Sequence, residues 1–186
     1  YTWDWTRFDP EAELRRMSVH DVITQLAAID APLLVITGGE PMLQQRQLIP
    51  VLEAARTRGW RVEIETNGTI APHDAVAALV DRWNVSPKLA GSGVDQARRW
   101  QPDALRALAA TGRAIGKFVV GSTSELDEVA AIAEATHLTD VWIMAEGTDA
   151  DTLRDRMAML APHVLARGWN LSNRLQVMLW GNVRGR

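Results

Sequence analysis

Short runs of branched apolar residues alternate along the chain with segments in which apolar residues recur every three or four positions. The clearest run covers residues 33–37 and ends at Gly38 and Gly39, a pattern typical of a parallel strand buried on both faces. Further runs predict strands at residues 62–65, 83–86, 114–120, 141–144 and, less clearly, 175–179. The pattern therefore predicts six strands separated by helices.

Helical spacing fills the intervals between these runs, as in the series Leu126, Val129 and Ile132. A proline costs about 3 kcal/mol inside a helix but little in its first turn. We therefore expect one helix to begin near residue 49, just before Pro50, and Pro162 to divide the segment 151–167 in two. Strands joined by right-handed helical crossovers predict one α/β domain over residues 1–186, built either as an open doubly wound sheet or as a full or partial βα barrel.

Composition narrows the class of protein without naming a function. Of 186 residues, 47% are hydrophobic and 23% charged, which is typical of a globular domain. The net charge of −3 and the lack of basic clusters give no support to a nucleic-acid partner, and no apolar run approaches the roughly 20 residues that span a bilayer. We expect a soluble, cytoplasmic protein with no nucleic-acid or membrane partner.

Cysteine is absent from the chain, and the four histidines lack the spacing of metal ligands. These residues alone therefore offer no disulfide, no thiolate nucleophile and no cysteine-ligated zinc or iron–sulfur centre. The chain opens at Tyr1 with neither a methionine nor a signal peptide, so we expect it to be trimmed at its N-terminus.

Polar and small residues follow four of the first five predicted strands, where parallel βα folds bind their ligands. They are Thr37, Gly38, Gly39, Glu40 and Pro41 after the first strand, Glu65 and Asn67 at the second, Ser86, Pro87 and Lys88 at the third, and Met144, Ala145, Glu146 and Gly147 at the fifth. Each group alone is consistent with an ordinary turn, and Lys88 alone with a solvated loop lysine. Their recurrence favours a site for a polar small molecule.

Five sequence blocks, in order, resemble 7-carboxy-7-deazaguanine synthase of the radical S-adenosylmethionine (SAM) superfamily. They are residues 36–44 (ITGGEPMLQ), 64–69 (IETNGT), 84–89 (NVSPKL), 117–120 (KFVV) and 179–186 (LWGNVRGR). The GGEP motif at residues 38–41 belongs to the whole superfamily, but the five blocks together, ending in the Trp-Gly-Asn tail, are far more specific. The resemblance covers almost the whole chain.

The resemblance implies a partial (β/α) barrel, homodimeric in the family, that converts 6-carboxy-5,6,7,8-tetrahydropterin to 7-carboxy-7-deazaguanine with loss of ammonia. The product feeds deazapurine synthesis, including that of queuosine. The implied cofactors are SAM, a [4Fe-4S] cluster that cleaves it reductively, and Mg²⁺. A flavodoxin-like or other reductant is implied as a partner.

Site residues follow from the resemblance position by position. The implied SAM-binding residues are Gly38, Gly39, Glu40, Pro41, Ser86, Pro87, Lys88, Met144, Ala145, Glu146 and Gly147. The implied substrate-binding residues are Thr37, Glu65, Asn67, Gln176 and Arg186. No catalytic residue and no metal ligand is assigned within this chain.

The chain departs from the family pattern in two ways: it lacks an upstream segment, and it has unusual residues at two positions. The cluster cysteines, the magnesium-binding threonine and a first strand belong upstream of Tyr1, so the strand at 33–37 should have an unpaired edge and the chain alone should be inactive. Gln176 stands where a histidine is common, and Ala145 where a proline is common.

Three hypotheses about function remain open from the sequence alone. The first is a family member whose cluster-binding segment lies outside these residues. The second is a noncatalytic, degenerate radical SAM scaffold that binds a small molecule. The third is a different radical enzyme, such as a glycyl-radical-activating enzyme, which shares GGEP but should lack the Trp-Gly-Asn tail.

Overall fold

The computed structural model describes residues 9, 11 and 14–183, and these residues form two compact units. The first unit contains the described residues up to Thr66 together with Pro72–Arg82. The second contains Asn67–Ala71 and the described residues from Trp83 onward. Each unit has its own strands and helices, and the single-domain organisation expected from the sequence stays a prediction.

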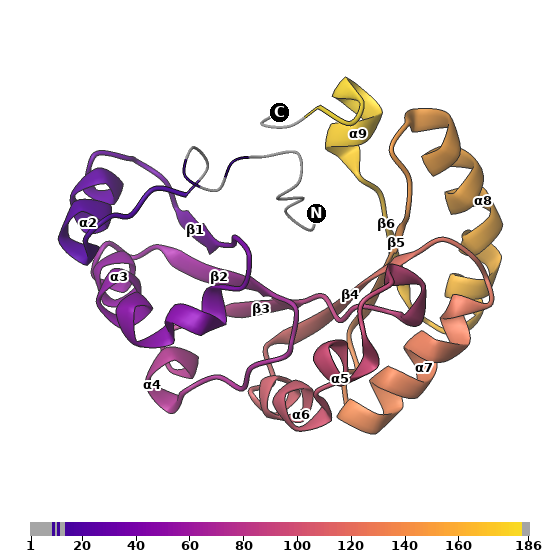
Figure 1. The fold of residues 1–186 in the computed structure, drawn as a ribbon, viewed down its shortest axis with the longest axis horizontal. Coiled ribbons are helices and arrows are strands. Elements are labelled where there is room, and N and C mark those ends of the chain that lie inside the picture. Colours follow the sequence, from indigo (N-terminus) through magenta and orange to yellow (C-terminus); the bar gives the residue numbers. More distant parts are fainter. Residues whose placement is uncertain (1–8, 10, 12–13, 184–186) are drawn as a thin grey trace. The chain divides into compact units, whose positions relative to one another are not determined.

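The first unit is a pair of parallel strands covered by helices (Figure 1). Its elements are α2 (Val19–Ala27), β1 (Leu33–Ile36), the short 3-10 helix η1 (Pro41–Gln44), α3 (Gln45–Thr57), β2 (Arg61–Thr66) and α4 (Asp74–Ala77). Leu33 pairs with Arg61 and Ile36 with Ile64, so both strands end at the same edge. Helix α3 packs on β2 and contacts α2 and α4.

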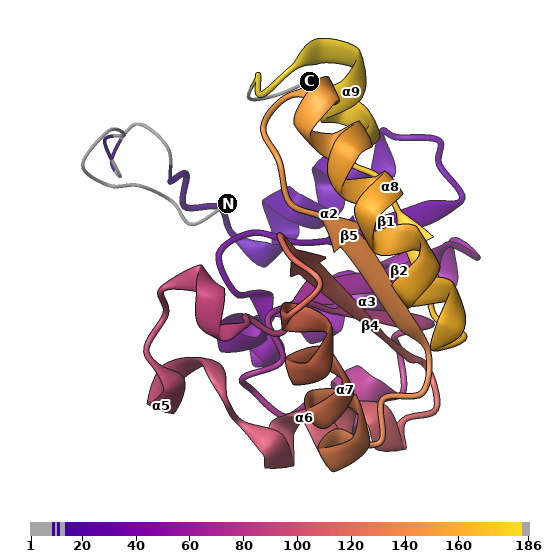
Figure 2. The same cartoon turned by 90° about the vertical axis from the view of Figure 1, so that its right-hand side faces the viewer.

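The second unit has four strands in the order β3-β4-β5-β6, and every described pairing among them is parallel. Its elements are β3 (Arg82–Val85), η2 (Ala90–Ser92), α5 (Gln96–Arg99), α6 (Pro102–Ala110), β4 (Ala114–Val120), α7 (Glu125–Thr136), β5 (Val141–Ala145), α8 (Ala150–Ala166), β6 (Asn170–Ser172) and α9 (Leu175–Trp180). Figure 2 shows α8 running along β5, with α9 at the end of the unit where α8 begins. No helix within residues 14–183 is long and apolar enough to cross a membrane.

Five of the six predicted strands are confirmed, with ends that differ by one residue at most. The prediction of a strand at residues 175–179 is wrong, because this segment forms α9 and the sixth strand is Asn170–Ser172. Leu175, Val177, Met178 and Leu179 form a short apolar run, and such a run does not distinguish a strand from a helix. In α9 only Val177 is buried, at 2% exposure.

Strand β1 is not buried on both faces, contrary to the prediction. Leu33 and Val35 are 40% and 43% exposed, while the residues between and after them are half-buried. Among the described residues β1 pairs along one edge only, with β2. One apolar face and one edge of this strand are therefore open in the described part of the chain.

Both proline predictions are wrong, since Pro50 lies inside α3 and Pro162 inside α8. A proline lacks the N–H that would bond the carbonyl four residues earlier. The carbonyls left without this bond belong to Arg46 and Ala158, and both residues are exposed. Water can therefore bond these carbonyls, which lowers the cost of keeping each helix continuous.

Asp81 fixes the start of β2 in the first unit. Its carboxylate accepts a hydrogen bond from the Val62 amide at 2.8 Å and two from Arg56 Nη1 at 2.7 and 2.8 Å, while its own amide donates to the Val62 carbonyl. Burial raises the pKa of Asp81, but the hydrogen bonds from Val62 and Arg56 outweigh it and the pKa is lowered.

Removal of the Asp81 carboxylate should destabilise the first unit. Asp81→Ala leaves the buried Val62 amide without an acceptor, so we expect a loss of about 1–3 kcal/mol in the free energy of unfolding. Asp81→Asn should cost less, because its amide oxygen can still accept from Val62. Urea denaturation of both variants measures the difference.

The contribution of Asp81 to the free energy of unfolding should decrease in acid. Because the folded-state pKa of Asp81 is lowered from 3.8, the ionised carboxylate stabilises the fold above that pH, and this contribution disappears as the pH falls through and below 3.8. The stability gap between wild type and Asp81→Asn should therefore close in acid. Asp103→Asn is the control, since Asp103 is 97% exposed; equal gaps for both variants at every pH would contradict the assignment.

Candidate functional site

The strand ends of the first unit are joined by two hydrogen bonds. Thr37, directly after β1, donates its hydroxyl to Glu65 Oε2 at 3.2 Å across the strand pair. Glu40 Oε1 accepts from the Thr66 hydroxyl at 2.8 Å and from the Met42 amide at 3.0 Å. The Glu40 carboxylate thus braces the turn after β1 against the end of β2.

The turn itself presents open backbone. Gly38 has φ of +142°, a conformation that side chains other than glycine rarely adopt. Gly38 and Gly39 are exposed, and a Cβ added at either would meet no atom within 4 Å. Pro41 is buried and begins η1, so the turn is fixed at its far end. A ligand could approach the peptide groups of these two glycines closely.

Asn67, predicted to bind substrate, shapes its own turn. Its Oδ1 accepts from the Thr69 amide at 2.9 Å and from the Thr69 hydroxyl at 2.6 Å. Gly68 has φ of +77°, and a Cβ there would lie 2.4 Å from Leu105 Cδ2 and 2.8 Å from Val85 Cγ1. The Asn-Gly pair is therefore required for packing within the second unit, whatever else Asn67 does.

The loop after β3 carries Ser86, Pro87 and Lys88, and it is tied to α7. Ser86 is half-buried, Pro87 buried and Lys88 exposed. Glu128 on α7 accepts from the Ala90 amide at 3.0 and 3.1 Å. Arg99 bridges Glu128, at 2.8 Å, and the Lys88 carbonyl, at 3.2 Å. The backbone of this loop is thus held at the Lys88 carbonyl and at the Ala90 amide.

Glu125 connects the loops after β3 and β4. Its Oε2 accepts from the Gly121 amide at 2.6 Å and the Ser122 amide at 3.2 Å. Its Oε1 lies so close to Gly91 that a Cβ there would be 2.4 Å away. The glycine at position 91 makes room for a carboxylate that is already fixed by two backbone amides.

The loop after β5 contains the third predicted SAM-binding group. Ala145 and Gly147 are buried, Met144 is half-buried and Glu146 is exposed. Arg156 donates to the Glu146 carbonyl at 2.6 Å and also pairs with the Glu146 carboxylate. The Gly147 carbonyl accepts a hydrogen bond from Arg174, which directly precedes α9, at 2.7 Å.

Strand β6 ends beside this loop, because Ser172 pairs with Met144. Ser172 Oγ is buried and has no hydrogen-bond partner among the described residues. Gln176 is exposed on α9. Arg186, the remaining predicted substrate-binding residue, lies outside the described residues.

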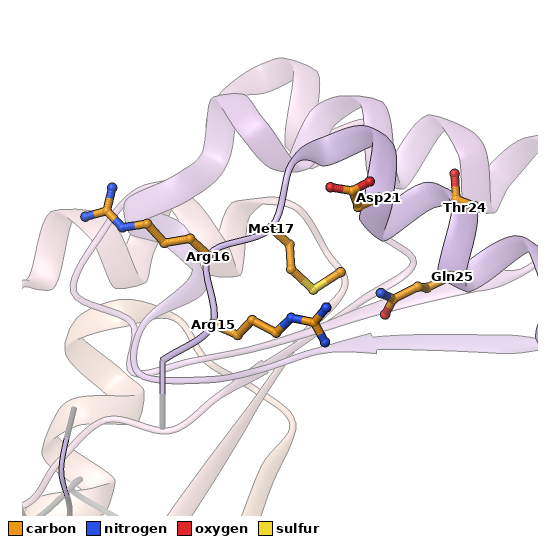
Figure 3. A pocket seen from close by; sticks show the side chains of 6 residues that line it. All are labelled: Arg15, Arg16, Met17, Asp21, Thr24 and Gln25. Carbon is orange, nitrogen blue, oxygen red and sulfur yellow. The ribbon is translucent and has the colours of Figure 1, made fainter. Parts of the chain in front are cut away.

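A surface hollow of about 340 Å³ lies elsewhere in the first unit (Figure 3). Figure 3 shows the Arg15 side chain pointing toward Gln25, while Arg16 points away. The hollow is lined by Arg15, Arg16, Met17, Asp21, Thr24 and Gln25. None of these was predicted as a site residue, and all but Met17 are exposed. No strand end contributes to the hollow, so the strand ends remain the better candidate for a site.

Sequence reasoning missed the charged residues that hold these loops. They are Arg99, Glu125, Glu128, Arg156 and Arg174. The two glutamates give a weak signal, since acidic residues in the first turn of a helix face the preceding loop. The arginines give none, because their partners lie 10 to 29 positions away in the sequence.

The chain is similar to known proteins along nearly its whole length. No family model matches the chain. It is 29% identical over 189 residues to the 7-carboxy-7-deazaguanine synthase of Pyrobaculum aerophilum, covering 100% of this chain and 80% of the relative. It is 33% identical over 194 residues to the 7-carboxy-7-deazaguanine synthase of Halobacterium salinarum, covering 90% and 72%. The chain belongs to the 7-carboxy-7-deazaguanine synthase family.

A solved structure agrees with this assignment at the level of the fold. The structure of Streptococcus suis SuiB bound to S-adenosylmethionine matches with a TM-score of 0.60 at 14% identity, covering 87% of this chain and 44% of that one. The predicted α/β fold class of the radical SAM type is therefore confirmed. Membership of an enzyme family follows from the relatives of Pyrobaculum aerophilum and Halobacterium salinarum.

Gly91→Ala should release the loop after β4. The added Cβ must displace the Glu125 carboxylate, which leaves the Gly121 and Ser122 amides without their acceptor. Loss of a charge-assisted hydrogen bond, about 1.5 kcal/mol, predicts about tenfold faster exchange of these amides. Hydrogen exchange followed by NMR measures this effect.

Gly39→Ala is the matched control, since its Cβ would enter open space in the first unit. It should leave the exchange of the Gly121 and Ser122 amides unchanged. Equal exchange rates in the Gly91→Ala and wild-type proteins would show that Glu125 can move aside without releasing the loop.

Proposed function

We propose that this chain supplies the SAM-binding and substrate-binding parts of an enzyme that converts 6-carboxy-5,6,7,8-tetrahydropterin to 7-carboxy-7-deazaguanine with loss of ammonia. Family membership over 90–100% of the chain is the observation that carries the proposal. The braced strand-end loops support it, because they contain the polar groups that such ligands require. The product would enter deazapurine synthesis, including that of queuosine.

In the first unit, the open turn of Gly38 and Gly39 would receive the methionine part of SAM, with Glu40 and Pro41 holding its shape. Backbone amides and carbonyls that a side chain does not cover can bond the amino and carboxylate groups of the methionine. Thr37, beside this turn, would face the substrate together with its partner Glu65.

In the second unit, Ser86, Pro87 and Lys88 would contact SAM, the loop Met144, Ala145, Glu146 and Gly147 would contact its adenosyl part, and Asn67, Gln176 and Arg186 would bind substrate. The Lys88 ammonium makes no hydrogen bond to a described residue and is exposed, so it is available to a ligand. SAM, once bound here and reductively cleaved, would supply the radical chemistry that removes hydrogen from substrate C6. The residues of this chain bind and orient the two reactants.

These 186 residues do not fit the [4Fe-4S] cluster. The sequence has no cysteine, and residues 14–183 contain no group of three His, Asp or Glu side chains that could hold a metal. The cluster expected of the family therefore needs cysteine ligands from outside these residues. We propose that the Mg²⁺ ion does as well and that the chain alone is inactive. A homodimer, a flavodoxin-like or other reductant and a cytoplasmic location belong to the proposal on family grounds.

The same lack of cysteine supports one alternative function. A scaffold that has lost radical chemistry could keep its loops and bind a small molecule without turnover. The two possibilities differ in what happens when cluster ligands are supplied.

Lys88→Ala should weaken SAM binding. A hydrogen bond to a charged group contributes about 1.5–3 kcal/mol, which corresponds to a roughly ten- to hundredfold higher dissociation constant. Titration calorimetry with SAM measures it, with thermal melting as the check on folding. Arg98→Ala, which removes an exposed cation from α5, should leave the affinity unchanged. Equal SAM affinity in wild type and Lys88→Ala would remove Lys88 from the site.

Anaerobic reconstitution with iron and sulfide separates the proposed function from its alternative. The chain as it stands should keep no visible charge-transfer absorption after desalting, because no thiolate is present. With a cysteine-bearing segment of the family joined before Tyr1, the protein should form 7-carboxy-7-deazaguanine, detected by mass spectrometry. A loaded cluster and SAM cleavage without that product would reject the substrate. A protein that binds SAM but never cleaves it would favour the noncatalytic scaffold.

A further inference from the structure

Two arginines hold consecutive carbonyl groups in the loop after β5. Arg156, on α8, donates to the Glu146 carbonyl at 2.6 Å, and Arg174, which precedes α9, donates to the Gly147 carbonyl at 2.7 Å. The two side chains come from different elements of the second unit and act on adjacent peptide groups. The direction of both carbonyls is thereby fixed.

Further contacts restrain the loop after β5. The Glu146 amide donates to the Val120 carbonyl at 2.8 Å, which continues the pairing of β5 with β4. Gly147 is buried, and a Cβ there would lie 2.9 Å from Leu153 Cδ2. Asp149 caps α8 by accepting from the Thr152 amide at 2.8 Å. The loop is therefore held at its start, at its two central peptides and at its exit.

Arg174 also joins this loop to the segment that carries Gln176. Its own carbonyl accepts from the Val177 amide at 2.8 Å and the Met178 amide at 3.1 Å, so it stands at the first turn of α9. Its side chain reaches back to Gly147, 27 positions earlier. One residue thus sets both the start of α9 and the path of the loop after β5.

We infer that Arg156 and Arg174 are positioning residues that hold the Glu146–Gly147 loop in the conformation that receives the adenosyl part of SAM. The inference rests on the proposed function, since it takes SAM as the ligand. With both carbonyls directed toward the guanidinium groups, the remaining surface of the loop keeps one shape, so less freedom is lost when a ligand binds. Neither arginine needs to touch the ligand for this effect.

Arg156 and Arg174 should contribute unequally to holding the loop after β5. Arg156 also pairs with the Glu146 carboxylate, whose side chain is 53% exposed, and such exposed pairs contribute little. Arg174 is half-buried and connects two loops. Replacement of Arg174 should therefore have the larger effect.

Binding of SAM and of its two fragments to the full chain tests the inference without any radical chemistry. NMR titrations with SAM, 5′-deoxyadenosine and methionine should show SAM and 5′-deoxyadenosine bound about tenfold more weakly by Arg174→Ala, and methionine bound as in wild type. A merely structural role would weaken all three ligands together. Arg174→Lys should recover most of the affinity, because the bond to the Gly147 carbonyl needs only one donor.

Arg154→Ala is the control, since Arg154 lies two residues from Arg156 on α8, is 66% exposed and, among the described residues, pairs with exposed Asp151. It should change none of the three affinities. If wild type binds neither SAM nor 5′-deoxyadenosine, the proposed function fails and the inference fails with it. If wild type binds them and Arg174→Ala binds all three ligands unchanged, or loses all three equally, the inference alone is overturned.

Discussion

The unpaired peptide groups at the ends of parallel strands are the constraint on which this structure depends. In-register pairing from β3 to β6 brings four loops to one edge of the second unit, and every loop carries amides and carbonyls that the sheet no longer bonds. Glutamates accept from the amides, as Glu125 does from Gly121 and Ser122. Arginines donate to the carbonyls, as Arg156 does to Glu146.

In the first unit, too, carboxylates accept hydrogen bonds from backbone amides at the ends of elements. Asp81 accepts from the Val62 amide where β2 begins, and Glu40 accepts from the Met42 amide where η1 begins. In each case a carboxylate satisfies a backbone donor that no strand or helix reaches. The carboxylates of Asp81 and Glu40 therefore hold the backbone in place.

Much of the fold could be predicted from the sequence, because a short apolar run rich in branched and aromatic side chains, such as residues 141–145, favours a strand over a helix. The strand-end loops could be predicted for the same reason, since each follows such a run. Helix α9 could not, because a run of six residues in which only Gln176 is polar fits either structure. The hydrogen-bonded pairs that hold the loops could not be predicted either. Ala90 and Glu128, for example, are 38 positions apart, and nothing in either segment indicates the other.

The hydrogen bonds also divide the predicted site residues into two kinds. Glu40, Asn67 and Glu146 already bond to the chain, so their first role is to shape loops, and any contact with a ligand would have to share them. The exposed Lys88 and Gln176 side chains make no hydrogen bond to a described residue. The predicted site residues thus include some that the fold itself requires and others, such as Lys88 and Gln176, that we propose for ligand binding. Under that proposal, a departure such as Gln176 from the histidine expected of the family pattern would change what is bound without changing the fold.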